Sequence, residues 1–347
     1  MQVFFHPDQM KHDPQTYFSR GMMRKPSEVP ERMANLLAAV RKLGYPIVEP
    51  QDHGDEIIAA VHSRDYLDFL RDAHAEWKQV PADWGDEVLS NIFVRCPGKP
   101  RSILAKAAHY IADGSAPIGA GTYQAVYWSA QSALAGAKAL LEGESEAYAL
   151  CRPPGHHARK EGAGGHCYLN NAAIAAQSLR SRFDRIAILD PDMHHGQGIQ
   201  ELFYDRDDVL YVSMHGDPVN FYPAVAGFED ERGSGPGLGF NLNLPMPHGT
   251  SEEQFFGYLA RALQAVQDFR PDALILTLGF DIFHEDPHAV AAVTVEGFGK
   301  LGAAIGALNL PVLIVQEGGY HLDSLDANAR AFFASFDAAR RAVTAPA

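Results

Sequence analysis

The sequence predicts an α/β protein with one eight-stranded, mostly parallel sheet and helices on both faces of that sheet. Short apolar stretches alternate with longer amphipathic stretches along most of the 347 residues. Such alternation is typical of a parallel sheet, because consecutive parallel strands are joined by crossovers that helices usually form. Several apolar stretches also end abruptly in charged residues, which is where ligands bind in sheets of this class.

The helices are predicted from apolar stripes at helical spacing and from residues that start or stop a helix. The helix at 30–43 has Pro30 in its first turn and Gly44 after its end, both favoured positions for these residues. The helix at 64–77 carries Tyr66 and Phe69 on one apolar stripe, as expected of an amphipathic helix. Further helices are expected at 55–61, 103–111, 123–141, 171–180, 198–204, 252–269, 295–308 and 324–341.

The strands are predicted from short apolar runs. The run from Ile186 to Leu189 is apolar, partly β-branched, and stops at Asp190. These properties are typical of a parallel strand that is buried on both faces. The other strands are expected at 2–5, 47–48, 148–151, 209–214, 240–244, 273–278 and 312–315, whereas residues 6–29 are expected to be polar and irregular.

Residues 79–122 interrupt the alternation of strands and helices. Proline and glycine are frequent in this segment, and only 103–111 has a helical pattern. A connection of this length inside a compact domain is usually functional or an interaction element. The chain shows no internal repeat and no linker, so we predict one domain, 1–347, in which 79–122 is an insertion.

The composition narrows the class of function. The chain carries 29 basic and 43 acidic residues, a net charge of −14, which argues against binding to a nucleic-acid backbone and favours cationic ligands. No apolar run approaches the ~20 residues of a membrane span, and the first residues do not resemble a signal peptide. The three cysteines are widely spaced, as in proteins of a reducing compartment. We therefore expect a cytoplasmic protein without a membrane segment.

Four of the predicted strands are followed at once by residues that can carry chemistry. Because the carboxyl ends of parallel strands meet at one edge of the sheet, these residues are expected to converge there. A single motif of this kind is weak, since a polar strand end followed by a helix cap has the same appearance. The four segments are Arg-Pro-Pro-Gly-His-His at 152–157, Asp-Pro-Asp-Met-His-His-Gly at 190–196, Gly-Phe-Asp at 279–281 and Gln-Glu-Gly-Gly-Tyr at 316–320.

The side chains at these strand ends predict a metal-assisted reaction. Asp192, His194 and Asp281 would supply three nitrogen and oxygen ligands, which leaves a coordination position free for water and substrate. The pair His156 and His157 would supply a general base and a general acid. Asp190 could then set the tautomer of one of these imidazoles, and the Tyr320 hydroxyl could stabilise an oxyanion. The alternative for Tyr320 is an ordinary half-buried tyrosine at a strand end.

These residues resemble the zinc-dependent histone deacetylase superfamily, which includes the bacterial acetylpolyamine amidohydrolases and has an arginase-like α/β fold. The matching stretches occur in the family's order, and the resemblance in fold covers nearly the whole chain. Besides the segments already named, Gly-His-Cys-Tyr-Leu-Asn-Asn at 165–171 belongs to the match.

The resemblance implies a role for each matching residue. One Zn²⁺ per chain would be held by Asp192, His194 and Asp281. His157 would be the general base, His156 its electrostatic partner, and Tyr320 the group that activates the carbonyl. A structural K⁺ is implied near Asp190, Asp192, His194, Ser213 and Met214, partly through backbone oxygens.

Two positions depart from the pattern of the eukaryotic deacetylases. Gln197 stands where many members carry Asp or Asn behind the second histidine, so His157 should be held less strongly as an imidazolium. His166 replaces an aromatic residue that normally walls the substrate tunnel, and Tyr222 is expected to form the opposite wall, with Gly165 also at the substrate. Such a tunnel is more polar than one between two phenylalanines.

The substrate is predicted to be a small acetylated amine. The 79–122 segment resembles the insertion by which acetylpolyamine amidohydrolases dimerise and narrow their entrance, so a homodimer is expected. Asp113 is the candidate contact for a distal ammonium group, although a solvated loop carboxylate has the same appearance. The alternatives are deacetylation of acetyl-lysine peptides or of other small amides, a two-metal ureohydrolase of the same fold, and an inactive binding protein. The last two fit less well, because one three-ligand set is present and the catalytic residues are retained.

Overall fold

The computed structural model describes residues 1–344 except residues 82 and 97. Its main sheet has eight strands, and every neighbouring pair in it is parallel. The predicted fold class is therefore confirmed. In sheet order the strands are β4 (Ile47–Val48), β1 (Gln2–Phe4), β5 (Glu146–Ala149), β10 (Val312–Gln316), β9 (Ala273–Leu278), β6 (Ile186–Asp190), β7 (Val209–Gly216) and β8 (Asn241–Met246).

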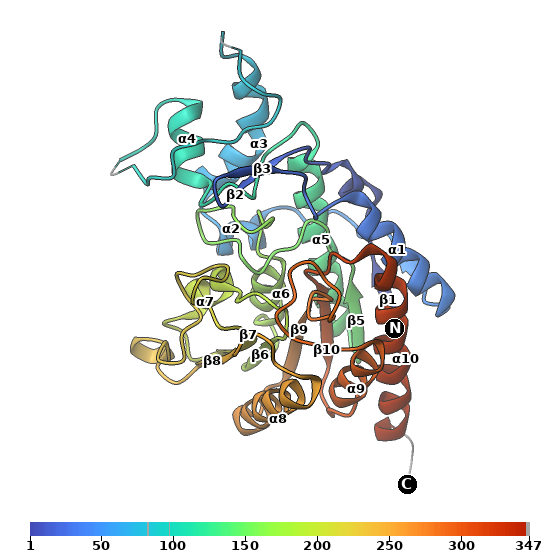
Figure 1. The fold of residues 1–347 in the computed structure, drawn as a ribbon. Coiled ribbons are helices and arrows are strands. Elements are labelled where there is room, and N and C mark those ends of the chain that lie inside the picture. The colour runs from blue at the N-terminus through green and yellow to red at the C-terminus, as the bar shows by residue number, and fades with distance from the viewer. Residues whose placement is uncertain (82, 97, 345–347) are drawn as a thin grey trace.

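Helices cover both faces of the sheet and form two hydrophobic cores (Figure 1). Alternate residues of one strand enter different cores: Leu313 packs in the first core and Ile314 in the second, as the two-residue period of a strand requires. The first core contains α2 (Glu56–Val61), α3 (Arg64–Lys78), α4 (Ile103–Tyr110), α5 (Thr122–Leu141), α6 (Asn171–Leu179) and α7 (Gln197–Phe203); the second contains α1 (Pro30–Lys42), α8 (Glu252–Phe269), α9 (Val295–Gly306) and α10 (Leu322–Thr344).

The predicted helices are present, with ends that differ by at most a few residues. Among the strands, the prediction at 148–151 is wrong by two residues, because β5 pairs with β10 from Glu146 onward and its ladder ends at Ala149. Strand β7 continues to Gly216, where it still pairs with β8. Within the described residues, no helix combines the length and the apolar character needed to cross a bilayer.

The prediction that residues 6–29 are irregular is wrong. This stretch contains a 3-10 helix, Pro7–Lys11, and an antiparallel hairpin of β2 (Tyr17–Ser19) and β3 (Met22–Arg24). Arg20 and Gly21, which connect the two strands, both have positive φ, as the favoured two-residue hairpin turns require. Arginine is rarely used in that position. The usual Asn-Gly signal was therefore missing from the sequence.

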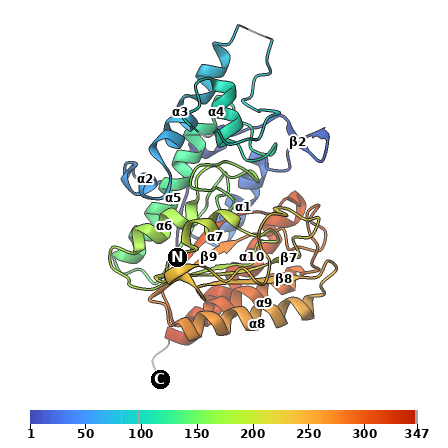
Figure 2. The same ribbon diagram turned by 90° about the vertical axis from the view of Figure 1, so that its left-hand side faces the viewer.

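The hairpin, α3 and α4 lie together at one end of the molecule in both views (Figure 2). The helix predicted inside the 79–122 segment is α4, and the flanking stretches pair through a bridge between Val88 and Ile118; residues 82 and 97 of that segment lie outside the described residues. A cavity is lined both by hairpin residues and by residues that follow the main strands. We call the hairpin, α3, α4 and the flanking stretches of 79–122 the cap. The cap therefore lies over the carboxyl edge of the sheet.

Candidate metal centre and active-site pocket

The four strand ends singled out in the sequence belong to four neighbouring strands. β5, β10, β9 and β6 occupy the middle of the sheet in that order. The chain passes from β5 to β6 and later fills the space between them with β9 and β10. The helices that follow β5 and β6 pack in the first core, whereas those that follow β9 and β10 pack in the second. Loops of neighbouring strands therefore leave the carboxyl edge toward opposite faces, which is the usual position of a binding site in such sheets.

The three predicted metal ligands lie together at this edge. The ligand atoms of Asp192, His194 and Asp281 are all within 4.8 Å of one another. Nδ1 of His194 is 3.0 Å from Oδ2 of Asp281 and 3.5 Å from Oδ1 of Asp192. Both carboxylates are buried. Burial, followed by the charge of Asp192, raises the pKa of Asp281. Two carboxylates that oppose each other's ionisation, with an imidazole between them, are a donor set that suits a divalent cation.

Backbone groups hold the two carboxylates in place. The Gly318 N–H donates to Oδ2 of Asp192 at 2.9 Å, and the Met193 N–H donates to Oδ1 of Asp281 at 3.1 Å. A Cβ on Gly279 would collide with the Asp192 carboxylate, and one on Gly318 would lie 2.7 Å from both carboxylates. The glycines of these motifs are therefore required by the close approach of the backbone to the acidic groups.

The two adjacent histidines have different environments. Nδ1 of His156 is 3.1 Å from Oδ2 of Asp190. Burial disfavours its protonation, yet the carboxylates of Asp192 and Asp190 raise the pKa of His156 to about 10. For His157, burial and then the positive charges of His156 and His194 lower the pKa well below its usual value. An imidazolium and a neutral imidazole therefore stand side by side, with ring centroids 3.9 Å apart, as in sites that separate acid and base roles.

Gln197 is the partner of His157. Its Oε1 lies 2.6 Å from Nδ1 of His157. An amide oxygen only accepts hydrogen bonds, so Nδ1 carries the proton and the neutral ring keeps a lone pair on Nε2. Gln197 also donates from Nε2 to the hydroxyl of Tyr222 at 3.3 Å. The predicted contact between Gln197 and the second histidine is therefore present.

Tyr320 is presented by the loop that follows β10. Its ring contacts His288 and lies under the guanidinium of Arg32, which is 4.7 Å from the ring centroid. Arg32 also donates to the backbone oxygens of Gly319 at 2.5 Å and Glu317 at 2.8 Å. The position of Tyr320 therefore depends on a residue of α1, far away in the sequence.

Behind this loop lies a cluster of charged residues that was not predicted from the sequence. Glu28 is fully buried and accepts hydrogen bonds from Arg32 at 2.8 Å and from Arg152 at 2.9 Å. Despite its burial, the two guanidinium groups lower the pKa of Glu28 to about 2. The only signal in the sequence was the spacing of Glu28 and Arg32, four residues apart at the start of a predicted helix.

A cavity of about 660 Å³ opens above these groups. His157, His194 and Tyr320 line it from the sheet edge, whereas Tyr17 and Phe18 line it from the hairpin of the cap. The predicted substrate residues all belong to its lining: Asp113, Gly165, His166 and Tyr222. The packing at Gly165 is so close that a Cβ there would collide with the His157 ring. Tyr17 and Phe18 were not predicted as pocket residues because the hairpin that carries them was not predicted.

The residues predicted to surround a potassium ion come from two adjacent strands. Asp190 pairs with Ser213 in the ladder between β6 and β7, and Met214 follows in β7. All three are fully buried. The Tyr211 hydroxyl donates to Oδ2 of Asp190 at 2.8 Å. Asp190 thus contacts His156 and lies beside Ser213, so one carboxylate connects the two predicted sites.

Comparison with known proteins gives matches along nearly the entire chain. The family model described as the histone deacetylase domain matches residues 26–336. An acetylpolyamine amidohydrolase of Burkholderia pseudomallei (strain 1710b) is 64% identical over 340 residues, which cover 98% of this chain and 100% of that protein. Acetylpolyamine amidohydrolase 1 of Pseudomonas aeruginosa is 38% identical, with 97% and 99% covered. The crystal structure of an acetylpolyamine aminohydrolase from Burkholderia pseudomallei, from an iodide soak, superimposes with a TM-score of 0.97 at 63% identity, covering 98% of this chain and 99% of that one.

Proposed function

Because the chain belongs to the histone deacetylase family, we propose that it hydrolyses the acetyl amides of small cationic amines, such as acetylputrescine or acetylcadaverine. The observation that carries this proposal is one pocket in which His157, His194 and Tyr320 meet beside the Asp192 and Asp281 carboxylates. The names of the similar proteins support the choice of acetylpolyamines among acetylated amines.

Asp192, His194 and Asp281 would hold one zinc ion, and their buried oxygen and nitrogen donors fit it. When bound, zinc polarises a carbonyl and lowers the pKa of a water molecule to about 7. Nε2 of His157 takes the proton of the attacking water, because the hydrogen bond to Gln197 keeps the proton of the neutral ring on Nδ1. The same Nε2 then returns the proton to the leaving nitrogen.

His156 and Tyr320 would act on the charge that develops during the reaction. His156 stays protonated beside Asp190 and Asp192, so it stabilises negative charge and keeps the neighbouring His157 neutral. The Tyr320 hydroxyl donates a hydrogen bond to the acyl oxygen as that oxygen becomes negative. Arg32 supports this role indirectly, because it fixes the backbone that carries Tyr320.

Further assignments complete the proposal. A structural potassium ion would lie near Asp190, Ser213 and Met214. The 79–122 segment would mediate a homodimer and restrict the entrance, as the resemblance implies. The protein would act in the cytoplasm.

The pocket suits a slim cation better than a folded protein. Aromatic side chains from the hairpin and from 221–222 line the cavity. Such side chains pack on methylene groups and attract ammonium groups. Asp113 contributes a carboxylate to the same lining. Arg20 and Arg24 also line the cavity, so the charge at its rim is mixed, and selectivity depends on where the distal ammonium reaches.

We expect acetylputrescine, acetylcadaverine or a longer acetylpolyamine to be hydrolysed with kcat/KM at least about tenfold above that of an acetyl-lysine histone-tail peptide, a difference of about 1.4 kcal/mol in transition-state binding. The measurement is a kinetic panel on purified enzyme whose zinc content has been quantified. Equal kcat/KM for the peptide would favour the alternative, a peptide deacetylase. No hydrolysis of any acetylated amine by zinc-loaded enzyme would overturn the proposed function.

The Gln197→Glu variant is expected to shift the acidic limb of the pH profile of kcat/KM to higher pH by about 1–3 units, because an adjacent carboxylate favours the imidazolium form. In the wild-type chain, burial and then the positive charge of His156 lower the pKa of His157. Its base form therefore persists to acidic pH, and raising that pKa removes activity from the acidic side first. An acidic limb that stays in place would mean that His157 is not the base.

A further inference from the structure

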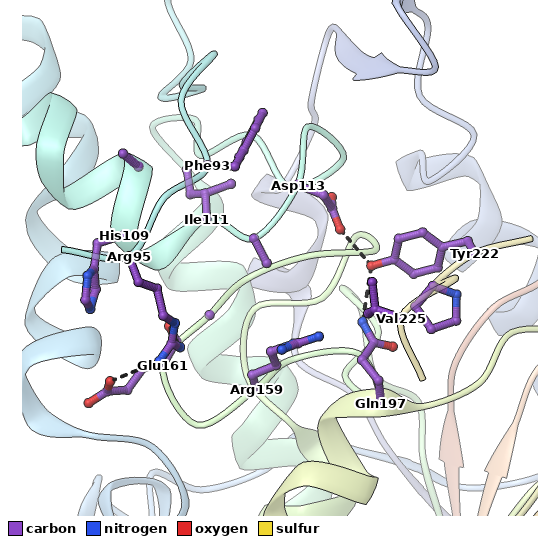
Figure 3. A pocket seen from close by; sticks show the side chains of 14 residues that line it. Phe93, Arg95, His109, Ile111, Asp113, Arg159, Glu161, Gln197, Tyr222 and Val225 are labelled. Atoms are coloured by element: carbon purple, nitrogen blue, oxygen red, sulfur yellow. Dashed lines mark hydrogen bonds and ion pairs between the residues drawn. The ribbon is translucent and has the colours of Figure 1, made fainter. Parts of the chain in front are cut away.

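Three hydrogen bonds connect the proposed general base to a carboxylate at the far wall of the pocket. His157 Nδ1 is 2.6 Å from Gln197 Oε1, Gln197 Nε2 is 3.3 Å from the Tyr222 hydroxyl, and that hydroxyl is 2.7 Å from Oδ2 of Asp113. The last two contacts are visible in Figure 3. We call this series the Asp113 chain. The residues come from α7 and from separate loops.

We propose that Asp113, acting through Tyr222, fixes the orientation of the Gln197 amide and thereby the tautomer of His157. Asp113 is thus a positioning residue for the base, in addition to lining the substrate pocket. This inference rests on the proposed role of His157 in hydrolysis, but its structural content is independent of that role.

The direction of each hydrogen bond follows from the chemistry of the groups. A carboxylate only accepts, so the Tyr222 hydroxyl must use its single proton on Asp113. The Tyr222 oxygen can then only accept from Gln197, which turns the amide nitrogen toward Tyr222 and the amide oxygen toward His157. Nδ1 of His157 must therefore be the donor, and Nε2 keeps the lone pair that a base needs.

The surroundings of Asp113 agree with an acceptor at the end of this chain. The other groups that contact its carboxylate are donors: the Ser115 N–H at 2.8 Å, the Ser115 hydroxyl at 2.5 Å and the Gly165 N–H at 3.2 Å. Gln197, in contrast, cannot fix the orientation of its own amide group. Its amide has similar shape in both orientations, with oxygen and nitrogen exchanged, so its direction must be imposed from outside.

Packing alone does not impose that direction. A second cavity of about 280 Å³ borders Gln197, Tyr222 and Asp113 (Figure 3). Asp113 and Tyr222 also line the first cavity, so the Asp113 chain forms part of the wall between the two cavities, and packing does not enclose the Gln197 amide on the side of the second cavity. A carboxylate in the place of Gln197 would need no such help, since both of its oxygens accept. The Asp113 chain therefore determines which end of the Gln197 amide faces His157.

Two substitutions test the chain at different points. Tyr222→Phe removes the group that accepts from Gln197. Asp113→Asn allows the reverse series, in which the new side-chain amide donates to Tyr222, Tyr222 donates to the Gln197 oxygen, and the Gln197 nitrogen faces His157. Both variants should move His157 from the Nδ1–H toward the Nε2–H tautomer. The direct readout is ¹⁵N NMR of enzyme labelled at histidine, with the His157 signal identified by its absence in His157→Ala.

The kinetic readout uses a neutral acetylated aromatic amine, so that any contact of Asp113 with an ammonium group plays no part. We expect kcat to fall about tenfold or more in both variants, since general-base catalysis is typically worth ~10²–10⁴-fold, with KM changed little. The matched control is Tyr127→Phe. It breaks a hydrogen bond between a tyrosine and an aspartate, Tyr127 to Asp52 at 2.5 Å, outside the pocket, and should change neither readout.

A double variant distinguishes a change in the orientation of the Gln197 amide from a general disturbance of the site. In a Gln197→Glu background both carboxylate oxygens accept, so adding Tyr222→Phe or Asp113→Asn should leave His157 in the Nδ1–H form. If His157 keeps that tautomer in both single variants, measured on protein shown by circular dichroism to be folded, the inference is wrong. If the tautomer shifts as expected while no acetylated amine is hydrolysed by the wild-type enzyme, the inference stands and the proposed function fails.

Discussion

The Asp281→Asn variant is expected to lose bound zinc and, with it, more than about a hundredfold in kcat/KM, because even substitutions next to metal ligands typically cost 10–100-fold in affinity or activity. Asp281 is one of two carboxylates in the candidate ligand set, and its neighbour Asp192 lies in the same buried group. The measurement is zinc per chain by elemental analysis, together with the rate of acetylputrescine hydrolysis.

The same substitution is expected to affect the thermal stability of the metal-free protein differently from its zinc binding. Without metal, the wild-type chain must bury two carboxylates that disfavour each other's ionisation, and the Asp281→Asn substitution removes one of them. We therefore expect the metal-free variant to melt no lower than the metal-free wild type. Zinc should raise the Tm of the wild type only, since a ligand at ~1,000 times its Kd adds about 4 kcal/mol to the folded state. Asp323→Asn, at an exposed position of α10, is the control. Unchanged zinc content in Asp281→Asn would rule out this ligand set.

The Tyr320→Phe variant is expected to lower kcat by about 10²–10³-fold, the usual cost of removing one donor to a developing oxyanion. KM and zinc content should change little, because the phenyl ring can keep the contacts with Arg32 and His288. The two variants therefore separate metal binding from carbonyl activation. Zinc content is measured alongside initial rates at saturating acetylputrescine.

Tyr258→Phe in α8 serves as the control for the loss of a tyrosine hydroxyl. If Tyr320→Phe retained full activity with one zinc per chain, the carbonyl would have to be activated without this residue, and the metal site would remain unaffected by that result. If it lost zinc, the assignment of separate roles would be wrong, because Tyr320 would then be needed for the metal site itself.

The main sheet could be predicted from the sequence because most of its central strands are buried on both faces. A run such as Val312–Gln316 is apolar at every position until its last residue, and the run leaves no ambiguity about where the strand lies. The convergence of the candidate ligands followed from the same fact, since parallel strands end at a common edge. Asp192 and Asp281 could therefore be placed together although they come from different strands.

The features that were not predicted depend on contacts between residues far apart in the sequence, and no local sequence pattern indicates such contacts. The hairpin of the cap has three-residue strands and a turn at Arg20, so neither alternation nor turn chemistry indicated it. Glu28 and Arg152 neutralise each other in the interior, which single-residue burial preferences would place outside. Gln197 could be recognised as unusual, but its link to Asp113 passes through Tyr222 and appears only in three dimensions.

The order of strands in the sheet has a consequence for biosynthesis. β9 and β10 lie between β5 and β6, so a nascent chain produces the two outer neighbours before the strands that join them. Asp192 and His194 arrive with β6, Asp281 only after β9, and Tyr320 after β10. The three proposed metal ligands are thus all present once the segment after β9 has been made, whereas Tyr320 follows only with β10. We therefore expect a chain that terminates before β10 to lack the proposed carbonyl-activating hydroxyl, although it carries the complete proposed ligand set.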